Sequence, residues 1–184
     1  PLTSLIIEPT NTCNLRCTFC FVTEGMTRDE GFMDLKLFKK VIDDTPDLEH
    51  LCMHNWGEPL LHKEIFEMFD YAHKAGVKHI VMNTNGTLLT DKMINKIIES
   101  PLNIIRFSID GSADTFKRIR GVELQKIKEN ILRLKKAKET KRPELSMGVV
   151  FTVEEDTQAD VEEYIEHWET IVDHVRIQPK LIQS

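Results

Sequence analysis

The 184-residue sequence lacks the features of several specialised classes of protein. No stretch is apolar for long enough to span a membrane, and residues 1–8 lack the basic segment and cleavage site of a signal peptide. Because the sequence starts at Pro1 rather than at methionine, loss of a leader stays open. The net charge of −6 lacks the excess of lysine and arginine that a general nucleic-acid binder needs. Four cysteines are too few for a small disulfide scaffold. We therefore expect a globular protein of a reducing compartment, the cytoplasm.

Short apolar runs alternate with segments of helical periodicity along the whole chain. The runs expected to form strands are residues 5–7, 50–54, 79–82, 104–109, 145–151 and 174–178. The segments expected to form helices are residues 35–42, 65–72, 93–98, 124–134 and 161–171. Nearly continuous apolar runs are typical of strands buried on both faces of a parallel sheet. The alternation predicts one α/β domain with six parallel strands, either an open doubly wound sheet or a full or partial barrel.

Three of the four cysteines lie within eight residues, directly after the first predicted strand. Cys13, Cys17 and Cys20 have the spacing C-x3-C-x2-C. Thiolates are the ligands of iron–sulfur clusters, and three of them leave one iron of a cubane open for a substrate, as catalytic metal sites require. The alternative is a structural zinc site, which needs a fourth ligand from Cys52 or a histidine. Otherwise Cys52 is expected to be a small buried hydrophobe within its strand.

The cysteine loop resembles the signature of the radical S-adenosylmethionine (SAM) superfamily, including an aromatic residue, Phe19, just before the last cysteine. The resemblance implies a [4Fe–4S] cluster on Cys13, Cys17 and Cys20, with SAM at its open iron. One electron, from a donor such as flavodoxin or ferredoxin, then cleaves SAM to a 5′-deoxyadenosyl radical that abstracts hydrogen from the substrate. It also implies a partial (β/α)6 barrel as a single core domain, residues 1–184, with Phe19 beside the cofactor.

The turn after the second predicted strand resembles the family's Gly-Gly-Glu motif. Gly57 and Glu58 match it, whereas Trp56 stands in place of the first glycine. The resemblance implies that the Glu58 carboxylate holds the SAM amine, an interaction that a carboxylate favours. An ordinary turn between a strand and a helix is the alternative interpretation.

The ends of the third to fifth predicted strands provide further candidate SAM contacts. Asn85 lies in an Asn-Gly pair, which is also a common turn sequence. Ser108 and Asp110 alternate with Ile109 and should face one side, where the family commonly binds the ribose hydroxyls or the methionyl carboxylate. Asp110 is alternatively a helix N-cap, and Val149 is either an adenine contact or a core residue.

Two arginines after the fourth predicted strand, Arg118 and Arg120, are each candidates to pair with the methionyl carboxylate of SAM or to be exposed helix residues. The isolated histidines, including His54, His62 and His174, receive no role, and no side chain is assigned as catalytic.

The residues of the cysteine, Gly-Glu-Pro and Ser-Ile-Asp-Gly motifs resemble those of the subgroup that carries a SPASM or twitch extension with auxiliary clusters. The chain ends just after the sixth predicted strand, so we expect the last core helix and a C-terminal region to be missing. Substrates of that subgroup are peptides, proteins and small molecules. Two alternatives to a radical SAM enzyme stay open, a non-catalytic scaffold that binds a cluster or SAM, and a zinc-stapled binding domain. Nucleic acid and membrane are not expected as partners.

Overall fold

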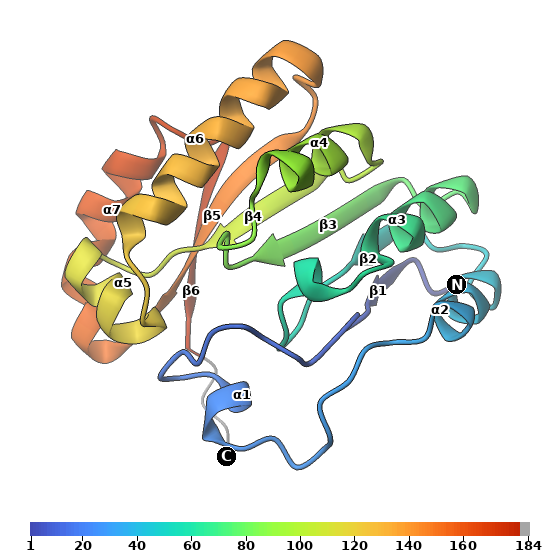
Figure 1. Ribbon diagram of the computed structural model, residues 1–184, viewed down its shortest axis with the longest axis horizontal. Helices are drawn as coiled ribbons and strands as arrows, with labels where there is room; N and C mark the ends of the chain where they lie inside the picture. The colour runs from blue at the N-terminus through green and yellow to red at the C-terminus, as the bar shows by residue number, and fades with distance from the viewer. Residues whose placement is uncertain (181–184) are drawn as a thin grey trace.

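The computed structural model describes residues 1–180, which contain one parallel sheet of six strands. The strands are β1 (Ser4–Ile6), β2 (His50–Cys52), β3 (His79–Thr84), β4 (Ile104–Ser108), β5 (Ser146–Val153) and β6 (His174–Pro179). They pair in chain order and curl into half of a barrel (Figure 1). A doubly wound sheet would reverse its strand order at a switch point, so the partial barrel is confirmed.

Helices cover one face of this sheet (Figure 1). The five predicted helices are confirmed as α2 (Leu35–Asp43), α3 (Ile65–Lys74), α4 (Asp91–Glu99), α6 (Leu124–Lys141) and α7 (Val161–Trp168). The structure adds the short helices α1 (Phe21–Glu24), η1 (Pro59–Leu61), α5 (Ala113–Arg120) and η2 (Glu155–Asp160). Side-chain caps mark several helix starts: Asp34, Thr90 and Ser112 accept hydrogen bonds from backbone N–H groups of the first turns of α2, α4 and α5. None of the helices within residues 1–180 has the length and apolar character needed to cross a membrane.

The two faces of the sheet differ in burial. The face toward the helices carries side chains that are at most 1% exposed, namely Leu51, Ile80, Met82, Ile105, Phe107, Met147, Val149 and Phe151. The opposite, inner face carries half-buried or exposed side chains, among them Cys52, Asn83, Arg106, Ser108, His174 and Arg176. The prediction of strands buried on both faces is therefore wrong for the inner face, because a half-barrel does not close over it.

Cys52 lies on this inner face and is only half-buried. Its Sγ lies 3.2 Å from His54 Nδ1. The interpretation of Cys52 as a core hydrophobe is thus corrected to a side chain of the half-barrel interior.

Candidate active site

The segment between β1 and α2 runs past the C-terminal ends of the strands (Figure 1) and carries the three clustered cysteines. Cys17 is 7% exposed and packs with Leu15 and Ile119. Cys13, Cys20 and Phe19 lie partly buried against the same apolar group. The backbone N–H of Thr18 donates to the carbonyl of Ile119 at 3.0 Å, which ties the loop to the end of α5. The three thiols therefore share one partly shielded patch at the edge of the sheet where α/β proteins place their chemistry.

Nitrogen donors approach two of the three sulfurs. Arg120 Nη1 lies 3.8 Å from Cys17 Sγ, and Asn85 Nδ2 lies 3.9 Å from Cys13 Sγ. Burial raises the pKa of the Cys17 thiol, and the Arg120 cation opposes that rise. Burial also raises the pKa of Cys13. Since only thiolates ligate metal, the nearby N–H groups and the positive charge favour the form of the sulfurs that a metal cluster requires.

A buried ion pair holds Arg120 in this position. Its Nε donates to Asp110 Oδ2 at 2.6 Å, while Asp110 Oδ1 accepts from the backbone N–H of Thr152 at 2.9 Å. Asp110 is 0% exposed and Arg120 is 9% exposed. Burial acts to lower the pKa of Arg120, but the Asp110 carboxylate and the Cys17 sulfur outweigh it and raise the pKa. Asp110 therefore faces Arg120 and is not the cap of α5, which Ser112 provides.

Glu58 links the second motif to the third. Its Oε1 accepts from Thr84 Oγ1 at 2.7 Å and from the Leu60 N–H at 3.1 Å, and its Oε2 accepts from the Asn85 N–H at 2.7 Å. The residue is 2% exposed. Burial raises the pKa of Glu58, and the hydrogen bonds from Asn85 and Thr84 oppose this. A carboxylate held by three donors has a fixed orientation beside the cysteine loop.

Gly57 packs directly against the cysteine loop. A Cβ at this position would lie 2.1 Å from the Thr10 carbonyl oxygen and 2.8 Å from that of Thr12. The next residue, Glu58, donates its N–H to the Thr12 oxygen at 2.9 Å. This backbone contact admits only glycine at residue 57, so the second motif fastens the loop to the end of β2.

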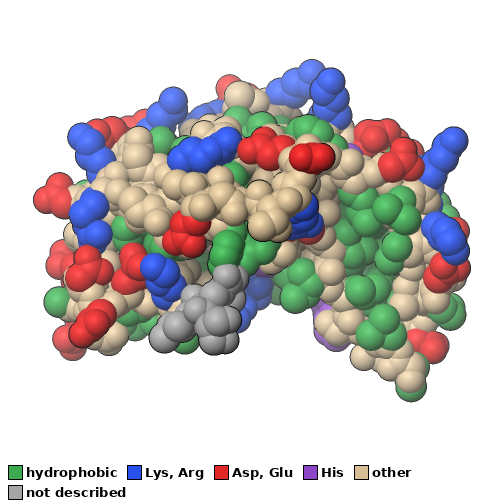
Figure 2. All heavy atoms as spheres, turned by 90° about the horizontal axis from the view of Figure 1, so that it is seen from below, with side chains coloured by type: hydrophobic (Ala, Val, Ile, Leu, Met, Phe, Trp, Pro, Cys, Tyr) green, Lys and Arg blue, Asp and Glu red, His purple; other side chains and the backbone are tan. Residues whose placement is uncertain are grey.

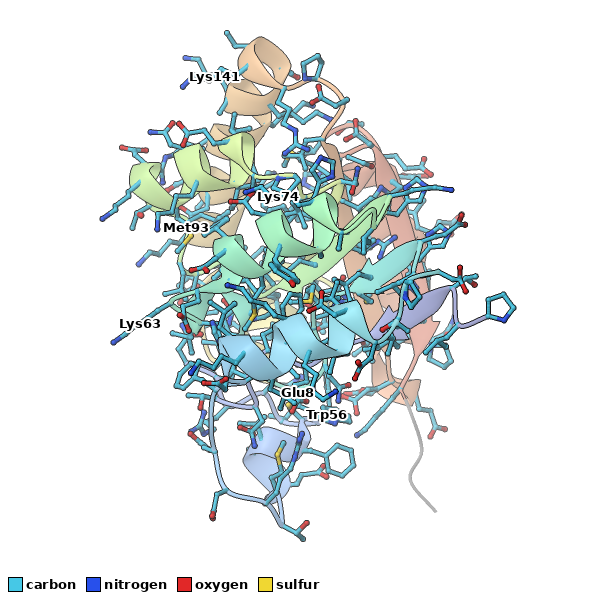
Figure 3. The ribbon with its side chains drawn as sticks, turned by 90° about the vertical axis from the view of Figure 1, so that its right-hand side faces the viewer. Glu8, Trp56, Lys63, Lys74, Met93 and Lys141 are labelled. Carbon is cyan, nitrogen blue, oxygen red and sulfur yellow. The ribbon has the colours of Figure 1, made fainter. Side chains whose placement is uncertain are left out.

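Trp56, the departure from the Gly-Gly-Glu pattern, does not disturb that contact. Its backbone N–H donates to Glu8 Oε2 at 3.1 Å, and its ring packs edge-on against Phe21 with centroids 4.5 Å apart. Figure 3 labels the side chains of Glu8 and Trp56, which lie near each other. The tryptophan thus fastens the loop at a second point, through Glu8 before the cysteines and α1 after them.

The remaining predicted site residues divide between the site and the core. Asn85 donates to Asn14 Oδ1 at 2.9 Å and lies against the cysteine loop. Ser108 is half-buried at the C-terminal end of β4, on the inner face. The Phe19 ring lies 5.9 Å from the Arg120 guanidinium carbon. Val149 is 0% exposed within the core beneath the helices, which corrects its assignment as an adenine contact, since alternation along β5 points it away from the inner face.

Sequence reasoning left several residues near the site without a role. Arg118 and Arg120 were both candidates to pair with the methionyl carboxylate of SAM. Arg118 instead pairs with Asp156 on the surface. Arg106, Arg176 and the histidines of the inner face were not assigned. Arg106 stands between apolar neighbours in a predicted strand, and that interruption is the signal that could have identified it.

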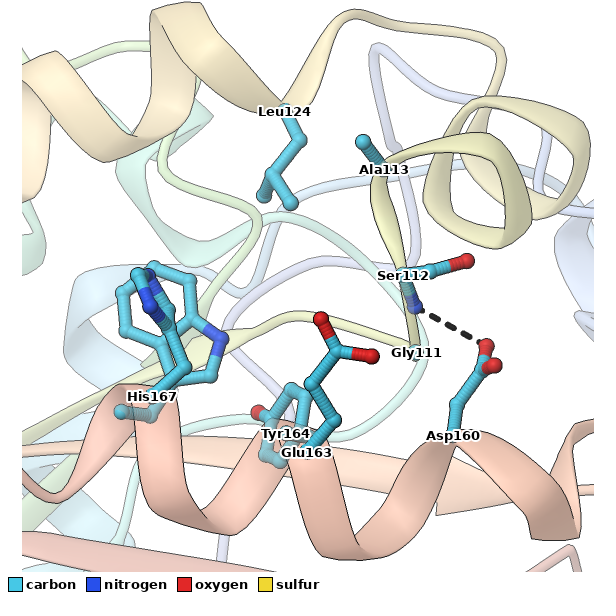
Figure 4. Close-up of a pocket in the computed structure, with 9 residues that line it drawn as sticks. Gly111, Ser112, Ala113, Leu124, Asp160, Glu163, Tyr164 and His167 are labelled. Atoms are coloured by element: carbon cyan, nitrogen blue, oxygen red, sulfur yellow. Dashed lines mark hydrogen bonds between the residues drawn. The ribbon is translucent and has the colours of Figure 1, made fainter.

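Two other features of the described residues bear on the choice of site. Residues 1–180 contain no group of three or more His, Cys, Asp or Glu side chains already placed to hold a metal ion, the three cysteines of the loop included. A cavity of about 210 Å³ lies on the helix side between α5, α6 and α7 (Figure 4). It is lined by Gly111, Asp160 and Tyr164 among others, but by none of the cysteines. The cysteine edge remains the candidate site.

Comparisons with known proteins agree with this geometry. The tungsten-containing aldehyde ferredoxin oxidoreductase cofactor-modifying protein of Pyrococcus furiosus is 34% identical over 159 residues, which cover 82% of this chain and 44% of that protein. The GTP 3′,8-cyclase of Desulforamulus reducens is 32% identical over 120 residues, which cover 62% of this chain and 37% of that protein. The chain thus spans less than half the length of these relatives.

Solved structures agree in fold. Streptococcus suis SuiB bound to S-adenosylmethionine matches 98% of this chain and 41% of its own, with a TM-score of 0.77 at 15% identity. The structure of anSMEcpe with bound AdoMet matches 98% of this chain and 52% of its own, with a TM-score of 0.79 at 22% identity. A family model described as the Radical SAM superfamily matches residues 7–167. This chain therefore belongs to the radical SAM superfamily of enzymes, whose cofactors are a [4Fe–4S] cluster and SAM.

Proposed function

We propose that this chain is the catalytic core of a radical SAM enzyme in which Cys13, Cys17 and Cys20 ligate the [4Fe–4S] cluster. When bound, the cluster and SAM would supply the electron and the 5′-deoxyadenosyl radical that abstracts hydrogen from the substrate. The observation that carries the proposal is the pair of N–H donors aimed at two of the sulfurs, Arg120 at Cys17 and Asn85 at Cys13. Such contacts around the ligands are what metal sites use to orient and tune them.

Within this proposal, the motifs at the strand ends bind and orient SAM. Glu58, fixed by its three hydrogen bonds, accepts the amine of SAM, an ion pair that compensates for the burial of its carboxylate. Gly57 and Asn85 present the neighbouring backbone and amide, and Ser108 binds a ribose hydroxyl or the methionyl carboxylate. Asp110 acts through Arg120, because its carboxylate is fully buried and is paired with the Arg120 guanidinium. Phe19 shields the cysteine loop from water on the side of Arg120.

The solved structures and the relatives indicate the class of substrate. SuiB has also been solved bound to its precursor peptide SuiA, and other relatives are named as synthases and cyclases of small molecules. A peptide or a small molecule is therefore the proposed substrate class, with a one-electron donor such as flavodoxin or ferredoxin. A cytoplasmic location and membership of the subgroup with a SPASM or twitch extension belong to the same proposal. The one cysteine outside the loop in these 184 residues is Cys52, so they supply no set of cysteines for an auxiliary cluster.

An anaerobic reconstitution tests this function. The protein is loaded with iron and sulfide, reduced with dithionite, and its EPR spectrum is recorded with and without SAM, while 5′-deoxyadenosine is measured by chromatography. We expect a [4Fe–4S]⁺ signal that changes on addition of SAM, with Cys17→Ala losing both the signal and the product. Cys52→Ala, which removes the cysteine outside the loop, is the matched control and should retain both.

The alternatives give different results. A cluster signal that SAM leaves unchanged, without 5′-deoxyadenosine, would favour a non-catalytic scaffold. Bound zinc without iron would favour a zinc-stapled domain. Retention of the cluster by Cys17→Ala would contradict the ligand assignment.

A further inference from the structure

Two arginines on the inner face of the half-barrel carry unpaired positive charge. Arg106 lies on β4 and is half-buried, and Arg176 lies on β6 and is exposed. Within residues 1–180 neither forms an ion pair, whereas Arg16, Arg28, Arg118, Arg120, Arg133 and Arg142 each do. A partly buried arginine without a counterion loses hydration that no partner replaces. This is the condition in which a protein gains most from binding an anion.

The strand register places the two arginines in neighbouring rows of the sheet, on either side of β5. Ser108 aligns with Val150, which aligns with Arg176, so these residues form one row across the sheet. Asn83, Arg106, Gly148 and His174 form the next row, further from the C-terminal ends. Two residues along a strand correspond to about 6–7 Å. Arg106 thus lies one row deeper inside the half-barrel than Ser108.

A glycine between Arg106 and His174 shapes this row. A Cβ at Gly148 would lie 2.2 Å from His174 Nε2. Because that space is free, the Arg106 side chain extends over Gly148, and its Nε–H donates to His174 Nε2 at 3.0 Å. The other nitrogen of the ring, Nδ1, lies 3.3 Å from Ser146 Oγ. Arg106 is therefore held by its Nε. Its two terminal nitrogens have no hydrogen-bond partner among the described residues, and a guanidinium can bind a carboxylate or a phosphate through two such nitrogens at once.

The neighbouring side chains of His54 and Asn83 carry no negative charge, and Asn83 Oδ1 is a buried acceptor without a partner among the described residues. His54 accepts the Asn83 N–H at Nδ1, at 3.2 Å, which leaves its Nε2 to carry the proton. Burial, with Arg106 and Arg176 nearby, lowers the pKa of His54 to about 4, so this histidine is a neutral donor at physiological pH. The carboxylates at the strand ends, Glu8, Glu58 and Asp110, are bonded to other groups. Seen from below, the lower margin of the molecule is indented, and histidine side chains show at the edge of the indentation (Figure 2).

We propose that Arg106 and Arg176 form a binding site for an anionic group of the substrate, a carboxylate or a phosphate, inside the half-barrel. The proposal rests on the proposed function and assigns the substrate class of the same site. Arg106 would hold the anion from one row behind Ser108 and Arg176 from the row of Ser108 itself. The remainder of the substrate would then be directed toward the cysteine edge, where hydrogen abstraction would take place.

Anion titrations of the reconstituted protein test this site. Inorganic phosphate and malonate are titrated separately by isothermal calorimetry, with the ionic strength fixed by sodium chloride. The variants are Arg106→Gln and Arg176→Gln, and the control is Arg133→Gln, which removes an arginine paired with Asp91 on the helix side. We expect one saturable site in the wild type, a Kd at least 10-fold higher in each inner-face variant, and a Kd within twofold of the wild type in the control. The anion with the lower Kd identifies the group, phosphate or carboxylate.

Further measurements distinguish a failure of the proposed anion site from a failure of the proposed radical SAM function. The affinity for SAM and the formation of 5′-deoxyadenosine without substrate should not change in Arg106→Gln or Arg176→Gln. A weaker SAM affinity in these variants would overturn the proposal, because the pair would then serve the carboxylate of SAM. Absence of saturable anion binding, or equal Kd values in all four proteins, would also overturn it. If the wild type makes no 5′-deoxyadenosine, the proposed function is wrong, but the Kd values from the titration still show whether Arg106 and Arg176 bind an anion. Arg106→Lys, which keeps the charge without the fork, should retain part of the affinity and covers a failure of Arg106→Gln to fold.

Discussion

The buried ion pair between Asp110 and Arg120 offers the sharpest test of how this site is assembled. Substitution of Arg120 by glutamine leaves the Asp110 carboxylate at 0% exposure with one remaining hydrogen bond, from the Thr152 N–H. Removal of one partner of a buried pair costs about 3–5 kcal/mol, because the other charge stays in a medium of low polarity. Since whole domains are stable by about 5–15 kcal/mol, Arg120→Gln should lose a large part of the free energy of unfolding.

An exposed pair on the same protein provides the comparison. Arg133 and Asp91 form an ion pair with side chains 44% and 90% exposed. Pairs of this kind contribute about 0.2–1 kcal/mol. Arg133→Gln should therefore change the free energy of unfolding by less than about 1 kcal/mol.

Urea denaturation of the metal-free, reduced protein measures both variants, with circular dichroism as the signal. The double variant Asp110→Asn/Arg120→Gln should lose less stability than the sum of its single variants, by at least about 1 kcal/mol, because neither charge is then left unpaired. If Arg120→Gln costs no more than Arg133→Gln, the pair is not buried in solution as described, and the placement of Arg120 beside Cys17 is wrong.

Three further predictions follow from individual contacts. Gly148→Ala should destabilise the protein by about 1–3 kcal/mol and weaken phosphate binding, because its Cβ would meet His174; Gly31→Ala, where nothing lies within 4 Å of the added Cβ, is the control in the same urea and calorimetric measurements, and equal effects would contradict the contact. His54 has a pKa of about 4, below its ordinary 6.5, so the unfolded chain binds more protons between these values, and the stability that neutral His54 contributes above pH 6.5, about 3 kcal/mol, is lost as the pH falls through 4. His54→Gln should remove that part of the slope in urea midpoints measured from pH 7 to pH 4, and an unchanged slope would refute the low pKa. Tyr164→Phe should leave stability unchanged or raise it by about 1–2 kcal/mol, because the buried Tyr164 hydroxyl has no partner among the described residues; a lower thermal midpoint would show that the hydroxyl is bonded in solution.

The succession of strands and helices along the chain could be predicted from the sequence because local patterns determine it. Apolar runs such as residues 79–82 and the stripe of residues 124–134 correspond to β3 and α6. The choice between an open sheet and a half-barrel could not be made, since it depends on whether strands add in chain order, and that is a long-range property of the packing.

The candidate site divides in the same way. The cysteines, Gly57, Glu58, Asn85 and Ser108 could be identified because motifs follow strand ends, where parallel sheets gather their polar groups. The role of Asp110 behind Arg120 could not be predicted, because ten residues separate the partners and they meet only through helix α5, which begins after Asp110 and ends at Arg120. For Val149 the choice between an adenine contact and a core residue could not be made, since a continuous apolar strand gives no alternation from which to tell its inner side from its core side.

The inner face shows why family motifs leave the substrate open. The groups proposed to bind the cofactors lie in loops past the strand ends, where their spacing in the chain identifies them. The proposed anion site lies within the strands, and its geometry depends on register: Arg106 reaches His174 only because the residue between them on β5 is Gly148. A larger residue at that position would keep the cysteine loop and the contacts of Glu58 while closing the path between the two side chains. If Arg106 and Arg176 bind the anion as proposed, single substitutions at inner-face positions of β4, β5 and β6 should change substrate preference without any change in the cofactor motifs.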